Sequence, residues 1–219
     1  MRREQIASTG AEFMARKKGK GGGKRKRSQQ RAQYDELDKY PVIPPHAFAR
    51  IVRDKQTLNI LYQIIEPPMT KKEQEQREEI MDIFIRSLTA NIEEIDADPD
   101  AYLRTALDKV IKSYGMKINK KSKSKMFYYL RRDLIGYGKM DMMMHDINVE
   151  DISLDGTNVP IFAYHRKFES VETTCVWETD AELESYVIKL AQRCGKHISV
   201  AEPLLDATLM DGSRIVMKL

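Results

Sequence analysis

The sequence predicts an α+β protein in which a small helical domain precedes a mixed α/β domain, after a disordered basic tail. Three observations support this prediction. A basic, glycine-rich segment opens the chain, apolar residues then recur at helical spacing over 70–140, and short β-branched runs surround one further helix in 141–219. With 219 residues, 42% of them apolar, the chain is long enough for two small domains in addition to a tail.

Residues 1–33 carry the excess positive charge. They hold 11 lysines and arginines against Glu4 and Glu12, whereas the rest of the chain holds 26 basic and 31 acidic residues. Glycines interrupt the basic run and apolar residues are scarce in it, so we expect this tail to be disordered. Its role stays open between a solubilising tail without a partner, a ligand of an anionic membrane surface and a ligand of nucleic acid.

Residues 34–69 predict a β-hairpin that leads into the helical domain. Apolar and polar residues alternate on both sides of Asp54-Lys55-Gln56, which is typical of two strands with one covered face. Pro67-Pro68 ends the second strand. The residues that fit a period of two are Phe48, Arg50, Val52, Leu58, Ile60, Tyr62 and Ile64.

The helical domain, residues 70–140, begins with a capping box. Thr70 and Glu73 are spaced so that the hydroxyl and the carboxylate each accept a hydrogen bond from a free backbone N–H. The apolar stripe expected behind this cap consists of Ile80, Met81, Phe84, Ile85 and Leu88.

Two more helices complete the predicted helical domain. The second begins at Asp98, followed by a proline at the first helical position, and ends at Gly115. The third runs from about Ser122 to Gly136. Three helices joined by short connections form a small helical unit.

Residues 141–219 predict the mixed α/β domain. The segments EDISLD, VPIFAYH and VETTCVW are short strands rich in β-branched and aromatic residues. Thr179 and Glu182 repeat the capping-box spacing ahead of a helix that ends at Gly195. Two final strands are expected at 204–209 and 214–219.

The sequence lacks the common motifs of an independent enzyme. No glycine-lysine pair stands in the GxxxxGK[ST] context of a phosphate-binding P-loop. The four histidines show no paired ligand spacing, so no metal site is predicted. Cys175 and Cys194 have no CxxC partner and suggest no disulfide framework. We therefore expect this chain alone not to be an enzyme.

Four segments nevertheless form a recognisable set. They are RRDLIGYGKMD at 131–141, VEDISLDG at 149–156, PIFAYHRKFESVETT at 160–174 and LAQRCGKHISVAEPLLDATLMDGSRI at 190–215. Together they resemble the N-terminal half of the archaeal type II/IV secretion ATPases, the family that includes archaellum and archaeal pilus assembly motors. The resemblance covers roughly 41–219. It implies the N-terminal piece of a larger motor whose P-loop core would follow Leu219.

The most specific part of the resemblance ends in Asp211-Gly212-x-Arg214. Asp211 and Gly212 form a turn signal between two apolar strands, which places Arg214 at the start of the second strand. The resemblance implies that Arg214 contacts the nucleotide held by the core, where a planar guanidinium can bind phosphate with two hydrogen bonds. The alternative is a surface arginine paired with a nearby carboxylate.

Three further cations are secondary candidates for the same contact. Arg193, Lys196 and His197 cluster where a helix ends. Cations are favoured at that position by the helix dipole alone, so a purely structural role remains the alternative.

The resemblance implies a regulatory, nucleotide-clamping region of a hexameric motor that powers secretion, pilus assembly or archaellum assembly. ATP and Mg²⁺ would be bound in the parent motor and not by this chain alone. The implied partners are the C-terminal ATPase core of the same protein, neighbouring subunits of the ring and a membrane platform protein, with an anionic membrane surface as a partner for the tail. The implied location is cytoplasmic, peripheral at the inner face of the cell membrane. The alternative function is a nucleic-acid-associated adaptor that uses the basic tail.

Overall fold

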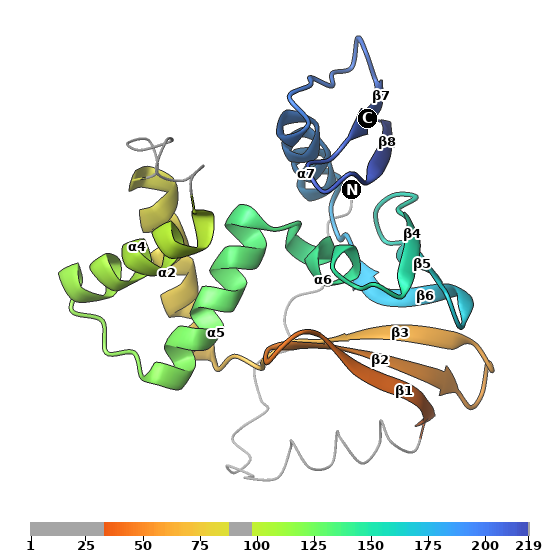
Figure 1. Cartoon of the computed structure of the whole chain (residues 1–219), viewed down its shortest axis with the longest axis horizontal. Helices are drawn as coiled ribbons and strands as arrows, with labels where there is room; N and C mark the ends of the chain where they lie inside the picture. The colour runs from red at the N-terminus through yellow and green to blue at the C-terminus, as the bar shows by residue number, and fades with distance from the viewer. Residues whose placement is uncertain (1–32, 88–97, 219) are drawn as a thin grey trace, which may run out of the picture.

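The computed structural model describes residues 33–87 and 98–218, and it confirms the α+β fold class. Almost all of the predicted basic tail lies outside these described residues. A helical domain stands beside a six-stranded sheet, and one helix with a two-stranded sheet lies over the other end of the molecule (Figure 1). The helices of the helical domain are α2 (Lys71–Ser87), α4 (Pro99–Ser113) and α5 (Lys120–Leu130).

The predicted hairpin is formed by β2 (Ala47–Asp54) and β3 (Ile60–Ile65), which pair antiparallel. A preceding strand, β1 (Tyr34–Ile43), pairs antiparallel with β2, so the segment contains three strands. β1 escapes prediction because its pairing register shifts between Glu36 and Asp38. Such a shift interrupts the period of two by which a strand is recognised in a sequence.

The three strands continue into the second half of the chain. The order of the sheet is β1-β2-β3-β6-β5-β4, with β4 (Val149–Ser153), β5 (Pro160–His165) and β6 (Glu169–Val176) at the predicted places. β3 and β6 are parallel and join the two halves through Leu61 and Glu172. The hairpin before the helical domain and the strands after it therefore share one sheet.

The predicted capping box starts α2. The Thr70 N–H donates to Glu73 Oε2 at 2.8 Å, and the Glu73 N–H donates to Thr70 Oγ1 at 3.2 Å. The buried Glu73 carboxylate also accepts from Ser122 Oγ at 2.7 Å and from Lys125 Nζ at 2.9 Å. The backbone bond from Thr70, then the bonds from Ser122 and Lys125, lower the pKa of Glu73 to about 2. One carboxylate thus fastens α2 to α5.

The apolar stripe of α2 is narrower than predicted. Ile80 and Phe84 are buried and Met81 packs against them, but Ile85 is 61% exposed. Ile85 is exposed because only one side of α2 faces the other helices, and Leu88 lies outside the described residues. The buried core of the helical domain consists of Ile80, Phe84, Leu103, Leu107, Met126 and Leu130.

The caps of α4 and α5 show one agreement and one correction. Asp98 Oδ1 accepts from the Ala101 N–H at 2.9 Å, and the chain leaves α4 through Gly115 at φ +60°, both as predicted. α5 begins slightly before the predicted start, because Asn119 provides its cap by accepting from the Ser122 N–H at 2.8 Å. The Ser122 hydroxyl is used instead to bind the α2 carboxylate.

A short irregular segment connects the helical domain to the second half. α5 runs into a π-helical turn, η1 (Arg131–Ile135), followed by the 3₁₀ turn η2 (Gly138–Met140) and the short helix α6 (Asp141–Met144). At Gly136, where the helix was predicted to stop, a Cβ atom would lie 2.1 Å from Asp141 Oδ1. Glycine is required here by close packing, not by a positive φ.

The helix after the sheet is capped differently from the prediction. Thr179 Oγ1 accepts from the Glu182 N–H at 3.3 Å, but the Glu182 carboxylate pairs with Lys139 Nζ at 2.9 Å and forms only half of the expected capping box. The elements of this region are α7 (Asp180–Arg193), β7 (Leu204–Thr208) and β8 (Arg214–Lys218), the last two forming an antiparallel hairpin.

A buried polar network joins β1, β3 and β5. Tyr40 and Tyr62 each donate a hydrogen bond to Asp146 Oδ2 at 2.7 Å. The Lys167 N–H donates to His165 Nδ1 at 3.1 Å, so the proton of the imidazole belongs on Nε2, which lies 2.9 Å from Tyr40 Oη. Burial lowers the pKa of His165 and keeps the ring neutral.

Candidate functional site

The turn between β7 and β8 places the principal predicted residue. Asp211 Oδ1 accepts from the Ser213 N–H at 2.9 Å, and Gly212 has φ +88°, a value that glycine adopts without strain. The Leu209 N–H donates to the Ser213 carbonyl at 2.8 Å and closes the loop. β8 then begins at Arg214, as the sequence predicts.

Arg214 and Asp206 form a two-pronged ion pair on the outer face of this hairpin. Nε donates to Asp206 Oδ1 at 3.1 Å and Nη2 donates to Oδ2 at 2.5 Å. The side chains remain 74% and 55% exposed. The bond to Asp206 raises the pKa of Arg214, and the bond from Arg214 lowers the pKa of Asp206. The surface pairing that the sequence left as an alternative is therefore present, and it holds the guanidinium in an exposed position.

Lys196, which follows α7, binds the backbone of the same aspartate and not its carboxylate. Its Nζ donates to the backbone carbonyl of Asp206 at 2.6 Å. Two of the four predicted nucleotide contacts, Lys196 and Arg214, thus meet at one aspartate. An anion that replaced the Asp206 side chain would meet the guanidinium of Arg214, with Lys196 bound to the backbone of the same residue.

Arg193 points to a different part of the molecule. Its Nη1 donates to the Gly136 carbonyl at 2.6 Å, and its guanidinium lies over the Tyr137 ring, 5.0 Å from the centroid. Tyr137 Oη in turn donates to Asp211 Oδ2 at 3.1 Å, and burial followed by this bond raises the pKa of Tyr137 to about 12. Arg193 is thus linked to the turn before Arg214, but only through Tyr137.

His197, the fourth predicted residue, is exposed and makes no hydrogen bond within the described residues. The structure therefore brings Lys196 and Arg214 together, attaches Arg193 indirectly and leaves His197 apart.

A feature that the sequence did not reveal is the attachment of α7 to the segment after α5. Lys189 Nζ donates to the Asp133 carbonyl at 2.6 Å, and Tyr186 Oη donates to the Tyr137 carbonyl at 3.0 Å. With the bond from Arg193, three side chains of α7 bind carbonyls where the helical domain ends. Backbone carbonyls leave no side-chain signal, so these contacts are invisible in the sequence.

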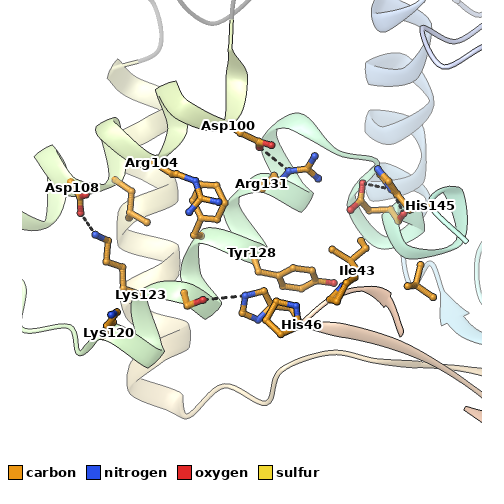
Figure 2. Close-up of a pocket in the computed structure, with 17 residues that line it drawn as sticks. Ile43, His46, Asp100, Arg104, Asp108, Lys120, Lys123, Tyr128, Arg131 and His145 are labelled. Atoms are coloured by element: carbon orange, nitrogen blue, oxygen red, sulfur yellow. Dashed lines mark hydrogen bonds and ion pairs between the residues drawn. The ribbon is translucent and has the colours of Figure 1, made fainter. Parts of the chain in front are cut away.

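A cleft of about 730 Å³ also lies between the helical domain, the β1–β2 turn and α6 (Figure 2). Part of its charged lining is paired. Arg131 Nε donates to Asp100 Oδ1 at 2.8 Å, and Lys123 forms an ion pair with Asp108. The lining comes from segments far apart in the chain, which is why no sequence pattern marked it.

Two cations that line this cleft, Arg104 and Lys120, make no ion pair within the described residues. The Arg104 guanidinium lies over the Phe127 ring, 3.9 Å from the centroid. His46 Nε2 lies 3.1 Å from Ser124 Oγ, and burial lowers the pKa of His46. The surplus charge at the cleft is therefore positive.

The described residues contain no group of histidine, cysteine, aspartate or glutamate side chains arranged to hold a metal ion. Cys175 is buried, and burial raises the pKa of its thiol to about 11, so it is not an activated nucleophile. Within the same residues, no helix combines the length and the apolar character needed to cross a bilayer.

No family model matches the chain. Over 155 residues it is 39% identical to the uncharacterized protein MJ1288 of Methanocaldococcus jannaschii, a match that covers 70% of this chain and 62% of that protein. It is 31% identical over 181 residues to the uncharacterized protein MJ0900 of the same organism, covering 81% of this chain and 32% of that protein. The chain thus spans less than two thirds of the length of either relative.

Proposed function

We propose that this chain is the N-terminal, nucleotide-clamping region of a hexameric ATPase of the archaeal type II/IV secretion family. The observation that carries the proposal is Arg214, held at the start of β8 with its guanidinium aligned and exposed. A guanidinium in this state can exchange a carboxylate for a phosphate, because both present two oxygens to the same pair of N–H groups.

Two features of the relatives agree with the proposal. The relatives come from an archaeon, and MJ0900 is matched over about a third of its length, as expected for one region of a larger protein.

In the proposed motor, ATP and Mg²⁺ are bound by a separate P-loop core of the same protein. Arg214 and Lys196 then meet the phosphates from the side of this domain when Asp206 gives way. Partners are the core, the neighbouring subunits of the ring and a membrane platform protein, at the inner face of the cell membrane. This region by itself is expected to hydrolyse no ATP.

The contacts of α7 suggest how nucleotide binding is transmitted. A shift of the β7–β8 hairpin pulls on Tyr137 through Asp211, and α7 binds the carbonyls of the same 133–137 segment. That segment continues directly from α5. Movement at Arg214 therefore reaches the helical domain through a short chain of hydrogen bonds.

The proposal is tested by ATPase kinetics of the assembled motor carrying Arg214→Ala or Arg214→Lys. We expect a loss of about 10-fold to 10³-fold in turnover, below the upper range for an arginine that stabilises the transition state. Lysine should restore little, because an ammonium group cannot form both bonds. Near-normal turnover in both variants would remove Arg214 from the site.

Arg166→Ala is the matched control. Arg166 is also an exposed arginine in an ion pair, with Glu150 at 3.0 Å, but it lies in the turn between β5 and β6. Its loss should leave turnover unchanged. Melting temperatures of all three variants separate a lost contact from a lost fold.

A further inference from the structure

Positive charge is concentrated at one end of the helical domain. Between Arg104 and Lys125 the chain has eight lysines and arginines and a single acidic residue, Asp108. The other residues from position 34 onward hold 18 basic and 30 acidic side chains. This stretch therefore has a net charge of +7 and the other residues from position 34 onward a net charge of −12, so the positive surplus lies on α4, α5 and the connection between them.

Five of these lysines form a surface that we name the lysine tip. Their side chains are exposed and have no ion pair or hydrogen bond within the described residues, whereas the side chains of Lys123 and Lys125 are bound to Asp108 and Glu73. The lysine tip occupies the end of α4, the connection and the start of α5, on the outer side of the helical domain (Figure 1), and Lys120 also lines the cleft beside the β1–β2 turn. Its members are Lys109, Lys112, Lys117, Lys120 and Lys121.

No acidic side chain of the described residues neutralises the charge of these five lysines. The first turn of α5 contains lysines and no acidic residue, so the positive end of the helix dipole adds to their charge. Like charges at this spacing repel one another. An anionic partner that contacts several of these lysines at once would relieve this repulsion.

Tyr114 stands among these lysines with 59% of its surface exposed. It follows α4 directly, and the partly buried Met116 and Ile118 lie in the same connection. A tyrosine has an apolar ring and a polar hydroxyl, which suits the boundary between lipid headgroups and acyl chains.

We infer that the lysine tip and Tyr114 dock this protein on an anionic lipid bilayer. Two observations favour a bilayer over nucleic acid. Five of the six exposed cations of this stretch that have no ion pair within the described residues are lysines, whose hydrated point charges suit a diffuse anionic surface, and the sixth, Arg104, lies over the Phe127 ring. Two-pronged recognition of individual phosphates is a property of arginine. The tip is also the projecting turn of a helical hairpin, a shape that brings many lysines to a flat surface.

Each lysine near an anionic leaflet strengthens binding about fivefold, and the attraction decays within about 8 Å at physiological salt. Several lysines together give measurable but salt-sensitive binding. This inference depends only on charge and shape, so it stands or falls independently of the nucleotide contact at Arg214.

The first experiment measures co-sedimentation of the full chain with vesicles of phosphatidylglycerol and phosphatidylcholine, and with phosphatidylcholine alone. The test variant is Lys117→Glu/Lys120→Glu/Lys121→Glu. The control variant makes the same change in net charge at exposed cations of the sheets that have no ion pair, namely Lys39, Arg53 and Lys218. The basic tail is present in all three proteins and cannot explain a difference between them.

We expect the tip variant to bind the anionic vesicles at least tenfold more weakly than the control variant. Equal binding by the two variants would overturn the inference. So would a tip variant that loses binding to a single-stranded oligonucleotide while its vesicle binding matches the control, because the tip would then be a nucleic-acid surface. Matching melting temperatures show that both variants are folded, since none of the exchanged side chains is buried.

A second experiment locates the contact. Tyr114→Trp adds a fluorophore at the tip, while Trp177 is buried and gives a constant background. Brominated lipids should quench the Tyr114→Trp protein in anionic vesicles. Tyr164→Trp, on β5 at a side chain that is 47% exposed, is the control that should not be quenched. Equal quenching of the two proteins would place the tip away from the bilayer.

Discussion

Asp206 and Arg214 lie diagonally across the β7–β8 hairpin and share two hydrogen bonds on its solvent-exposed face. The carboxylate occupies the place on the guanidinium that a phosphate would take. Exposed pairs of this kind contribute little to stability. In the proposed function, Asp206 keeps the Arg214 guanidinium aligned until the phosphate of a nucleotide displaces the carboxylate.

This relationship predicts the effect of Asp206→Asn. The change removes the competing charge, so if the proposed motor is correct its affinity for nucleotide should rise a few-fold, roughly 3-fold to 10-fold, while the melting temperature stays the same. Equilibrium titration with a fluorescent nucleotide analogue measures the affinity. A drop in affinity as large as that of Arg214→Ala would mean that Asp206 orients Arg214 in the bound state as well.

A second prediction concerns Glu73. Its pKa of about 2 in the folded protein lies below the ordinary glutamate value, so its contribution to stability is complete above about pH 4.5 and is lost as the pH falls toward 2. Glu73→Gln should lower the free energy of unfolding by about 2–3 kcal/mol at pH 7 and flatten the pH dependence between about 5 and 2. Urea denaturation at several pH values tests both statements.

Glu75→Gln is a suitable control for this experiment. Glu75 is an exposed residue of the same helix, and the change should leave stability within about 0.5 kcal/mol of the wild type. If Glu73→Gln unfolded with the same acid dependence as the wild type, the carboxylate would not hold α2 on α5.

A third prediction concerns His165. Burial lowers its pKa, so the unfolded chain takes up a proton more readily than the folded protein, and stability should fall as the pH drops below about 6.5. His165→Gln should lessen that slope between about pH 6.5 and 5, a window above that of Glu73. A slope that is unchanged in the variant would assign the effect to another group.

A fourth prediction concerns two glycines that are needed for different reasons. Gly136→Ala would place a Cβ atom 2.1 Å from Asp141 Oδ1 and 2.9 Å from the Arg132 carbonyl, and we expect a loss of about 3 kcal/mol. In Gly115→Ala the new Cβ atom would meet no atom within 4 Å, so only the positive φ of +60° is unfavourable. We expect the free energy of unfolding to fall by about 1–2 kcal/mol. Chemical denaturation compares them; equal losses would contradict the packing explanation.

The local elements were largely determined by the sequence. Thr70, Asp98 and Thr179 cap the helices that their spacing predicted, and Asp211-Gly212 forms the turn that starts β8 at Arg214. These features depend on side chains that bind backbone groups within a few residues. Such interactions depend only on the spacing of nearby residues, so they can be predicted without knowledge of the fold.

Only the tertiary structure determined which of these elements pair and which side chains bind one another. The sequence alone did not reveal that β3 pairs with β6 and makes one sheet from both halves, because strand neighbours far apart in the chain leave no periodic signal. The sequence placed four cations in one candidate set, namely Arg193, Lys196, His197 and Arg214. In the folded chain Arg193 instead donates a hydrogen bond to the Gly136 carbonyl, and Arg214 pairs with the Asp206 carboxylate. The lysines of the tip were equally visible in the sequence, but the placement of α4, α5 and their connection beside the sheet was not, because it depends on packing between segments far apart in the chain (Figure 1).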